Sequence, residues 1–241
     1  MGHSSPTRLL GVVALFWCLA FIQNADAQRP TAMPHTPDLL GIHIGMPAAE
    51  AKAQLQKHSA DVYVQYDSQN PAQGFGLTLM GEPYDQVLAL TTLPPNAPAI
   101  WRVERNQLFS NQKPLPRNAL LDSLHQKYGK ETLSRSTDAG HLELYWIFDA
   151  DGRLRPQADP GLMECSHQQP GAAGGGMYPQ CMKEFFGLYV LINGTADTVQ
   201  SYNMVLVSDP FEVQAIKATA AKQADDDRHA PKKPTAEAPR F

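Results

Sequence analysis

The order of the secondary-structure patterns constrains this sequence most, because a helix followed by a run of short strands occurs twice. The first helix is expected over 47–58 and the second over 117–129. Strand patterns follow them at 61–66, 76–80, 87–93 and 101–109, and then at 141–148, 186–192 and 198–207. Strands that follow one another without intervening helices favour an antiparallel sheet. We therefore predict an α+β fold with helices packed on one face of the sheet, built from two similar helix–strand units.

Each of the two helices has apolar residues at helical spacing, which predicts one buried face. These residues are Ala48, Ala51 and Leu55 in the first helix and Leu121, Leu124 and Tyr128 in the second. Gly129 gives the second helix a stop signal. A short strand with alternating Leu40, Ile42 and Ile44 is expected just before the first helix. In the strand at 101–109, the alternation predicts that Arg102 and Glu104 face water.

A third helix is expected after the last strand, where Asp209 is a suitable N-cap and Pro210 a suitable first helical residue. Glu212 stands three residues after the expected cap, as in a capping box. Two apolar faces remain open for this helix, namely Phe211, Ala215 and Ala218, or Val213, Ile216 and Ala220. The charged, proline-rich segment 225–241 predicts a disordered tail, because it has little apolar surface to bury.

The N-terminal segment has the three parts of a secretory signal peptide. Arg8 precedes an apolar run of roughly fourteen residues, which is shorter than the about 20 that a membrane span needs. Ala25 and Ala27 form an A-x-A cleavage site, so 1–27 is expected to be removed. An uncleaved membrane anchor is the alternative. After cleavage we expect a periplasmic or secreted protein without stable membrane insertion.

The mature chain would begin with an extended leader over 28–38 and continue as an α+β domain over 39–224, with halves at 39–110 and 111–224. The formal net charge of the chain is −4. Because nucleic-acid-binding proteins carry a basic patch or stripe, this balance gives no reason to expect a nucleic-acid partner.

Cys165 and Cys181 enclose the segment CSHQQPGAAGGGMYPQC, which is the main candidate for a special site. In an oxidising compartment two remaining cysteines predict a disulfide. A metal site would add His167, but zinc prefers four tetrahedral ligands and this spacing is unfamiliar. A glycine cradle for phosphate and a reactive thiol are the other readings. We predict a disulfide-closed loop that offers His167, Met177 and Tyr178 as a candidate interaction surface.

Catalytic motifs are missing from the sequence: there is no G-x-S-x-G, H-E-x-x-H, C-x-x-C or G-x-x-x-x-G-K-[ST]. The sequence at 149–152, DADG, predicts a β-turn rather than a calcium loop, because the later ligand positions hold Arg153 and Pro160. No spacing brings together the histidines, which are His43, His58, His125 and His141. We therefore predict no catalytic residue, cofactor or metal. The rival hypothesis is a hydrolase that assembles His141, Glu143 and a serine from distant positions.

Residues 42–58, IHIGMPAAEAKAQLQKH, resemble the G-M-(S/T/P)-x-x-E opening of small bacterial envelope proteins such as the SmpA/BamE lipoproteins and the β-lactamase-inhibitor-like fold. Residues 120–129 and 144–152 are similar to a pattern of uncharacterised exported proteobacterial proteins. The resemblance implies helix-plus-antiparallel-sheet units that bind protein.

Together these features predict an exported, non-enzymatic protein that binds another protein of the cell envelope, through an exposed sheet face or through the loop with Met177 and Tyr178. An inhibitor or immunity role falls within the same class. The alternatives from other classes are the hydrolase and a carrier of small ligands, which would need an apolar cavity between sheet and helix.

Overall fold

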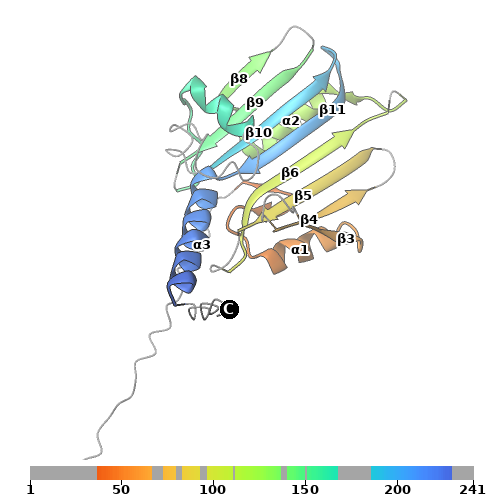
Figure 1. Ribbon diagram of the computed structural model, residues 1–241. Helices are drawn as coiled ribbons and strands as arrows, with labels where there is room; N and C mark the ends of the chain where they lie inside the picture. Colours follow the sequence, from red (N-terminus) through yellow and green to blue (C-terminus); the bar gives the residue numbers. More distant parts are fainter. Residues whose placement is uncertain are drawn as a thin grey trace, which may run out of the picture.

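A computed structural model gives the structure of the chain and shows one large antiparallel sheet (Figure 1). It describes residues 37–66, 73–79, 83–92, 97–110, 112–136, 140–149, 151–167 and 186–229. The expected signal peptide and all but the last two residues of the expected leader lie outside these ranges. Of those two, Asp38 lies in a short strand. None of the helices in the described ranges is long and apolar enough to span a membrane.

The described residues form three α-helices, one 3₁₀ helix and two sheets, of two and nine strands. The elements are β1 (Asp38–Leu39), β2 (Ile42–His43), α1 (Ala48–Gln56), β3 (Val62–Tyr66), β4 (Gln73–Leu79), β5 (Tyr84–Thr91), β6 (Ile100–Leu108), β7 (Leu115–Pro116), α2 (Arg117–Tyr128), β8 (Leu133–Ser136), β9 (Leu142–Phe148), η1 (Pro160–His167), β10 (Phe186–Gly194), β11 (Thr198–Val207) and α3 (Asp209–His229).

The order of strands across the large sheet is symmetric about its centre. The order is β3-β4-β5-β6-β11-β10-β9-β8, and β7 pairs with one end of β11. Each half therefore consists of a helix followed by a meander of four strands, and the last strands of the two meanders, β6 and β11, pair antiparallel. The predicted α+β fold with two similar helix–strand units is confirmed.

The main hydrophobic core lies between the sheet and the two helices α1 and α2. Ala51 and Leu55 of α1 are buried, as are Leu120 and Leu124 of α2. These pairs are spaced four residues apart, so each helix presents one apolar stripe to the strands. The same core contains the fully buried Trp146, and Figure 1 shows α2 behind the strands of the second half. We call this side of the sheet the covered face.

A second, smaller core lies on the opposite side of the sheet, which we call the open face. Trp101, Tyr145 and Tyr189 belong to it, and Leu162 of η1 packs onto them. Phe211, at the start of α3, also contacts this cluster. The segment with η1 and the start of α3 therefore cover part of the open face, over the second half of the sheet. The helices α1 and α2 both pack on the covered face, as predicted.

Two short strand segments, one before α1 and one after α2, differ from the sequence-based expectation. The expected strand through Leu40 is instead a tight turn between β1 and β2, because Leu40 and Gly41 have positive φ angles of 53° and 79°. The four-residue β8 is absent from the predicted strands. Its outer residues Ser134, Arg135 and Ser136 are exposed, so it lacks the apolar alternation that would have revealed it.

The third helix starts one residue earlier than expected and ends later. Ser208, not Asp209, precedes the first turn, and its carbonyl oxygen accepts from the Glu212 N–H at 3.1 Å. The helix extends to His229, so 225–229 is helical although a disordered tail was expected from 225. A Lys222–Asp226 ion pair of 3.0 Å and an Arg228–Asp225 pair of 3.0 Å support this end. Residues 230–241 lie outside the described ranges.

Candidate binding face

The open face carries two neighbouring rows of side chains, one that crosses all eight strands of the main path and one that crosses seven of them, from β4 to β8. Because side chains alternate between faces along each strand, the cross-strand register fixes which residues share a row. The first row, which we call the apolar row, contains Tyr63, Gly76, Leu88, Glu104, Val205, Tyr189, Tyr145 and Leu133. The second, which we call the polar row, contains Thr78, Gln86, Asn106, Asn203, Leu191, Glu143 and Arg135.

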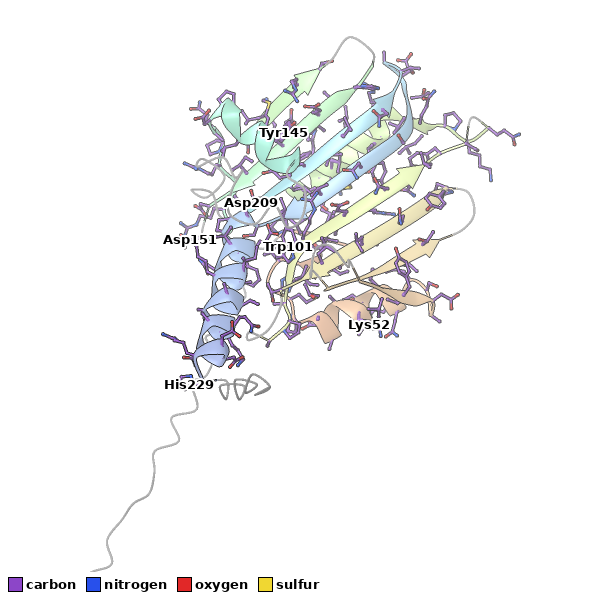
Figure 2. All side chains as sticks on the ribbon, viewed as in Figure 1. Lys52, Trp101, Tyr145, Asp151, Asp209 and His229 are labelled. Carbon is purple, nitrogen blue, oxygen red and sulfur yellow. The ribbon has the colours of Figure 1, made fainter. Side chains whose placement is uncertain are left out.

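The apolar row is buried in the second half of the sheet and accessible in the first. Tyr145 and Tyr189 are 1% and 8% exposed, and their rings meet edge to face with centroids 5.3 Å apart. Leu162 and Met163 of η1 pack against this cluster. At the other end of the row, Tyr63 is 37% exposed. Tyr145 is labelled in Figure 2, on the half of the sheet beside η1.

The polar row is half-buried along the middle of the sheet, and its hydrogen bonds run between strands. The Asn203 amide Nδ2 donates to Oδ1 of Asn106, directly opposite on β6. At the end of the row, Arg135 donates to Glu143 at 2.6 Å, and the Tyr145 hydroxyl donates to the same carboxylate at 2.7 Å. The charges of this row are therefore paired with each other, and its centre consists of neutral amides.

A shallow depression of about 70 Å³ lies where the two rows meet over β9, β10 and β11. Tyr145, Tyr189 and Asn203 line it, together with the Glu143 carboxylate. Small-molecule sites usually enclose about 300–1,000 Å³. The depression therefore has room for one side chain of a partner and is too small for the cavity that the ligand-carrier alternative requires.

Four charged residues lie close together beside the rows, at the start of α3, and are largely shielded from solvent. They are Arg102, Glu104, Asp209 and Glu212. Arg102 of β6 is 6% exposed, and its Nε donates to Glu104 at 2.5 Å. Asp209 and Glu212 of α3 are buried next to this pair. Burial and the neighbouring Glu212 raise the pKa of Asp209 to about 7, while Arg102 acts in the opposite direction. Figure 2 shows Asp209 and Trp101 at the start of α3.

This cluster corrects one expectation and decides one alternative that the sequence leaves open. Arg102 was expected to face water, but the first turns of α3 pack over its end of β6 and bury it. Of the two faces predicted for α3, the one with Phe211 and Ala215 meets the sheet, and Glu212 is buried beside it. The sequence pattern could not show this, because an acidic residue in a first helical turn is usually a surface feature.

On the covered face, another ion pair joins the middle strands of the first half. The Arg105 guanidinium donates to both carboxylate oxygens of Asp85, with a closest contact of 2.6 Å. Asp85 is 5% exposed, and Arg105 also lies 5.9 Å from the ring centroid of Tyr202. Nearby, the Tyr128 hydroxyl donates to the Asp38 carbonyl oxygen at 2.7 Å, and burial raises the pKa of that hydroxyl. The position of the pair between helices and sheet indicates a structural role.

The histidines are spread over separate elements. His125 lies on α2 and contacts Glu131 at 2.6 Å, and His43 contacts the Ile44 carbonyl oxygen at 3.0 Å. The Glu143 carboxylate of the hydrolase hypothesis is engaged by Arg135 and Tyr145. No group of three histidine, cysteine or acidic residues within the described ranges is placed to hold a metal ion.

The β-turn predicted at 149–152 is confirmed, since the Gly152 N–H donates to the Asp149 carbonyl oxygen at 3.0 Å.

The cysteine segment, the strongest candidate in the sequence, lies largely outside the described residues. The backbones of Cys165 and His167 belong to η1, while the positions of their side chains are not described. Cys181, Met177 and Tyr178 fall outside the described ranges. The disulfide and the interaction loop thus remain predictions. An exposed sheet face was among the expected binding surfaces, but its residues were not predicted, because each strand contributes only one or two of them.

Comparison with protein-family models, with curated proteins and with solved structures finds no match for this chain.

Proposed function

We propose that the chain is an exported, non-enzymatic protein that binds another protein of the cell envelope, and that the open face is its recognition surface. The observation that carries this proposal is the polar row. Neutral amides lie half-buried in the middle of a broad sheet, and the charged groups around them are paired internally.

This composition suits a protein partner. The centre of a protein–protein interface is depleted in charged residues and enriched in aromatic ones, and each buried polar group needs a partner. Asn106 and Asn203 offer amide donors and acceptors to a partner's backbone. Leu108, at the same face, is 53% exposed and supplies apolar area beside them. The export component of the proposal rests on the signal-peptide pattern of 1–27.

Site-specific photo-crosslinking in living cells tests the open face directly. A photoreactive amino acid at Asn106 is expected to give a discrete adduct with one envelope protein. The matched control is the same amino acid at Gln126, which is exposed on α2 at the opposite side of the sheet. Adducts from both positions alike, or from Gln126 alone, would contradict the open face as the recognition surface. A hydrolase would instead yield turnover in an activity screen and no adduct.

A further inference from the structure

The two edges of the large sheet, β3 and β8, differ in how they meet solvent. Native proteins protect exposed edges with short strands, charges, prolines or bulges, because an unpaired strand invites another chain. The edge at β8 follows this rule, since it has four residues and includes Arg135. The edge at β3 does not, because its five residues, VYVQY, contain no charge and no proline.

Apolar side chains gather at the β3 edge on both sides of the sheet. Three large hydrophobic residues are exposed within the described ranges, and two of them are neighbours on β3: Tyr63, 37% exposed, and Val64, 43% exposed. Tyr63 lies on the open face and Val64 on the covered face, beyond the end of the core. A strand placed beside β3 would cover apolar surface on both of its sides.

The ring of Tyr63 is held against the sheet and does not depend on a partner for its position. A Cβ atom at Gly76, directly opposite on β4, would lie 2.6 Å from the Tyr63 ring. Only glycine leaves room for the ring to lie across the neighbouring strand. The apolar ledge at this edge is therefore formed in advance, which lowers the entropic cost of binding.

The charges that flank β3 indicate what kind of strand would pair there. Asp61 is exposed just before the strand, and Asp67 follows it in the sequence. In a second copy paired antiparallel about Val64, the two strand ends that these acidic residues adjoin in the sequence would meet, and like charges brought together across strands are destabilising. Basic residues at both ends of an incoming segment would instead be complementary.

We propose that the outer edge of β3 binds an extended peptide segment of a partner protein as an added antiparallel strand. The segment has two adjacent apolar residues in its middle, opposite Tyr63 and Val64, and a lysine or arginine at each end. Alternate residues of an edge strand point their N–H and C=O groups outward, so the backbone supplies affinity and the side chains supply specificity. This site is separate from the polar row and stands even if the open face binds nothing.

A labelled peptide tests this site on the full chain. The probe has seven residues, with capped ends, lysine at both termini, valine and tyrosine in the middle and threonine elsewhere. We expect fluorescence anisotropy to show binding that weakens at least about tenfold when the lysines are replaced by glutamate. Methylation of alternate backbone nitrogens on the peptide is expected to abolish binding, because it removes the ladder hydrogen bonds.

Protein variants locate the site. Val64→Lys is expected to weaken binding at least about tenfold, since it replaces an apolar contact with a charge opposite the apolar middle of the peptide. Gln126→Lys is the control, because Gln126 is also exposed but lies on α2, away from this edge. Equal binding of both peptides, no binding at millimolar concentration, or binding insensitive to Val64→Lys would overturn the proposal.

Hydrogen exchange and sedimentation distinguish other occupants of the edge. We expect the outward amides of 62–66 to exchange rapidly in the free chain and slowly with the peptide. Slow exchange in the dilute free chain would overturn the proposal in favour of a segment of the same chain. A concentration-dependent dimer that Val64→Lys dissolves would overturn it in favour of a second copy.

Discussion

The two halves of the sheet contain the same elements in the same order, yet their open faces differ. In the second half, the segment with η1 and the start of α3 pack over the apolar row and bury Tyr189 and Tyr145. In the first half, the apolar row ends in the exposed Tyr63. The covered face, by contrast, is alike in both halves, because each half contributes one helix to the main core.

This difference separates folding from recognition. A sheet that is packed on one face only needs the other face to be polar or to be covered. The second half covers it, which builds a second core, and the first half leaves it accessible. The surfaces proposed for binding, the polar row and the β3 edge, lie where the cover ends. Changes under the cover should therefore affect stability, and changes on the uncovered part of the open face should affect binding more than stability.

The largest effect is expected in the main core, on the covered face of the second half. Trp146 is fully buried, and its indole Nε1 donates to the Gly129 carbonyl oxygen at 2.8 Å. Trp146→Ala should lower the free energy of unfolding by about 3–5 kcal/mol, since it leaves a large cavity. Val87→Ala, in the same core but in the first half, removes less volume and should cost about 2 kcal/mol. Urea denaturation measures both, and equal losses would mean that the loss of Trp146 leaves no larger cavity than the loss of Val87.

The next effect is a pH dependence at the start of α3. The pKa of Asp209 is raised to about 7 from an ordinary value of 3.8, so the folded chain holds this proton more tightly than the unfolded chain does. The contribution of Asp209 is thus most favourable below about pH 4, is lost as the pH rises to about 7, and stays constant above it. At about 1.4 kcal/mol per pKa unit, the loss is at most about 4 kcal/mol.

Asp209→Asn isolates this contribution from the other titrating groups. The variant should resemble the wild type near pH 4 and unfold at a higher urea concentration than the wild type at pH 8. Asp225→Asn is the control, because Asp225 is exposed near the end of the same helix. If Asp209→Asn lowers the stability at pH 8, the buried carboxylate is a favourable partner of Arg102 and the sign of this prediction is wrong.

The sequence predicted what depends on local patterns. The helices α1 and α2 and most strands appeared because their apolar residues recur at the spacing of their own element. β8 was missed because a four-residue edge strand with three exposed positions has no alternation. The end of α3 was missed because its stability comes from pairs such as Lys222 and Asp226, four residues apart, in a segment whose composition is typical of disorder.

The candidate site could not be predicted in the same way. Asn106 and Asn203 are 97 residues apart and meet only because β6 and β11 pair at the centre of the sheet. The sequence pattern correctly predicts that Arg102 lies in a strand but wrongly predicts that it is exposed. The helix that buries it, α3, follows β11 and not β6, so the local pattern around Arg102 cannot indicate the burial. The register between distant strands, which composition and periodicity do not encode, decides both results.

Two tyrosines of the apolar row compare the halves directly. Tyr189 is buried against Tyr145, so Tyr189→Ala should cost about 3 kcal/mol of unfolding free energy. Tyr63 is more exposed and lies over Gly76, so Tyr63→Ala should cost about 1 kcal/mol or less. Chemical denaturation of the two variants under identical conditions measures the difference. A cost at Tyr63 that matches the cost at Tyr189 would mean that the first half of the open face is also covered.

The smallest effect on stability is expected at Leu108, where the effect on binding should be large. Its side chain is 53% exposed, so Leu108→Asp should change the free energy of unfolding by less than about 0.5 kcal/mol. The same change puts an unpaired charge beside Asn106 and Asn203. It should therefore reduce the photo-crosslinked adduct from Asn106 by roughly tenfold or more, if this surface lies at the centre of an interface. Gln126→Asp on α2 should leave the adduct unchanged. If Leu108→Asp destabilises the fold strongly, Leu108 belongs to a core rather than to an accessible face, and the contrast between the two halves no longer holds.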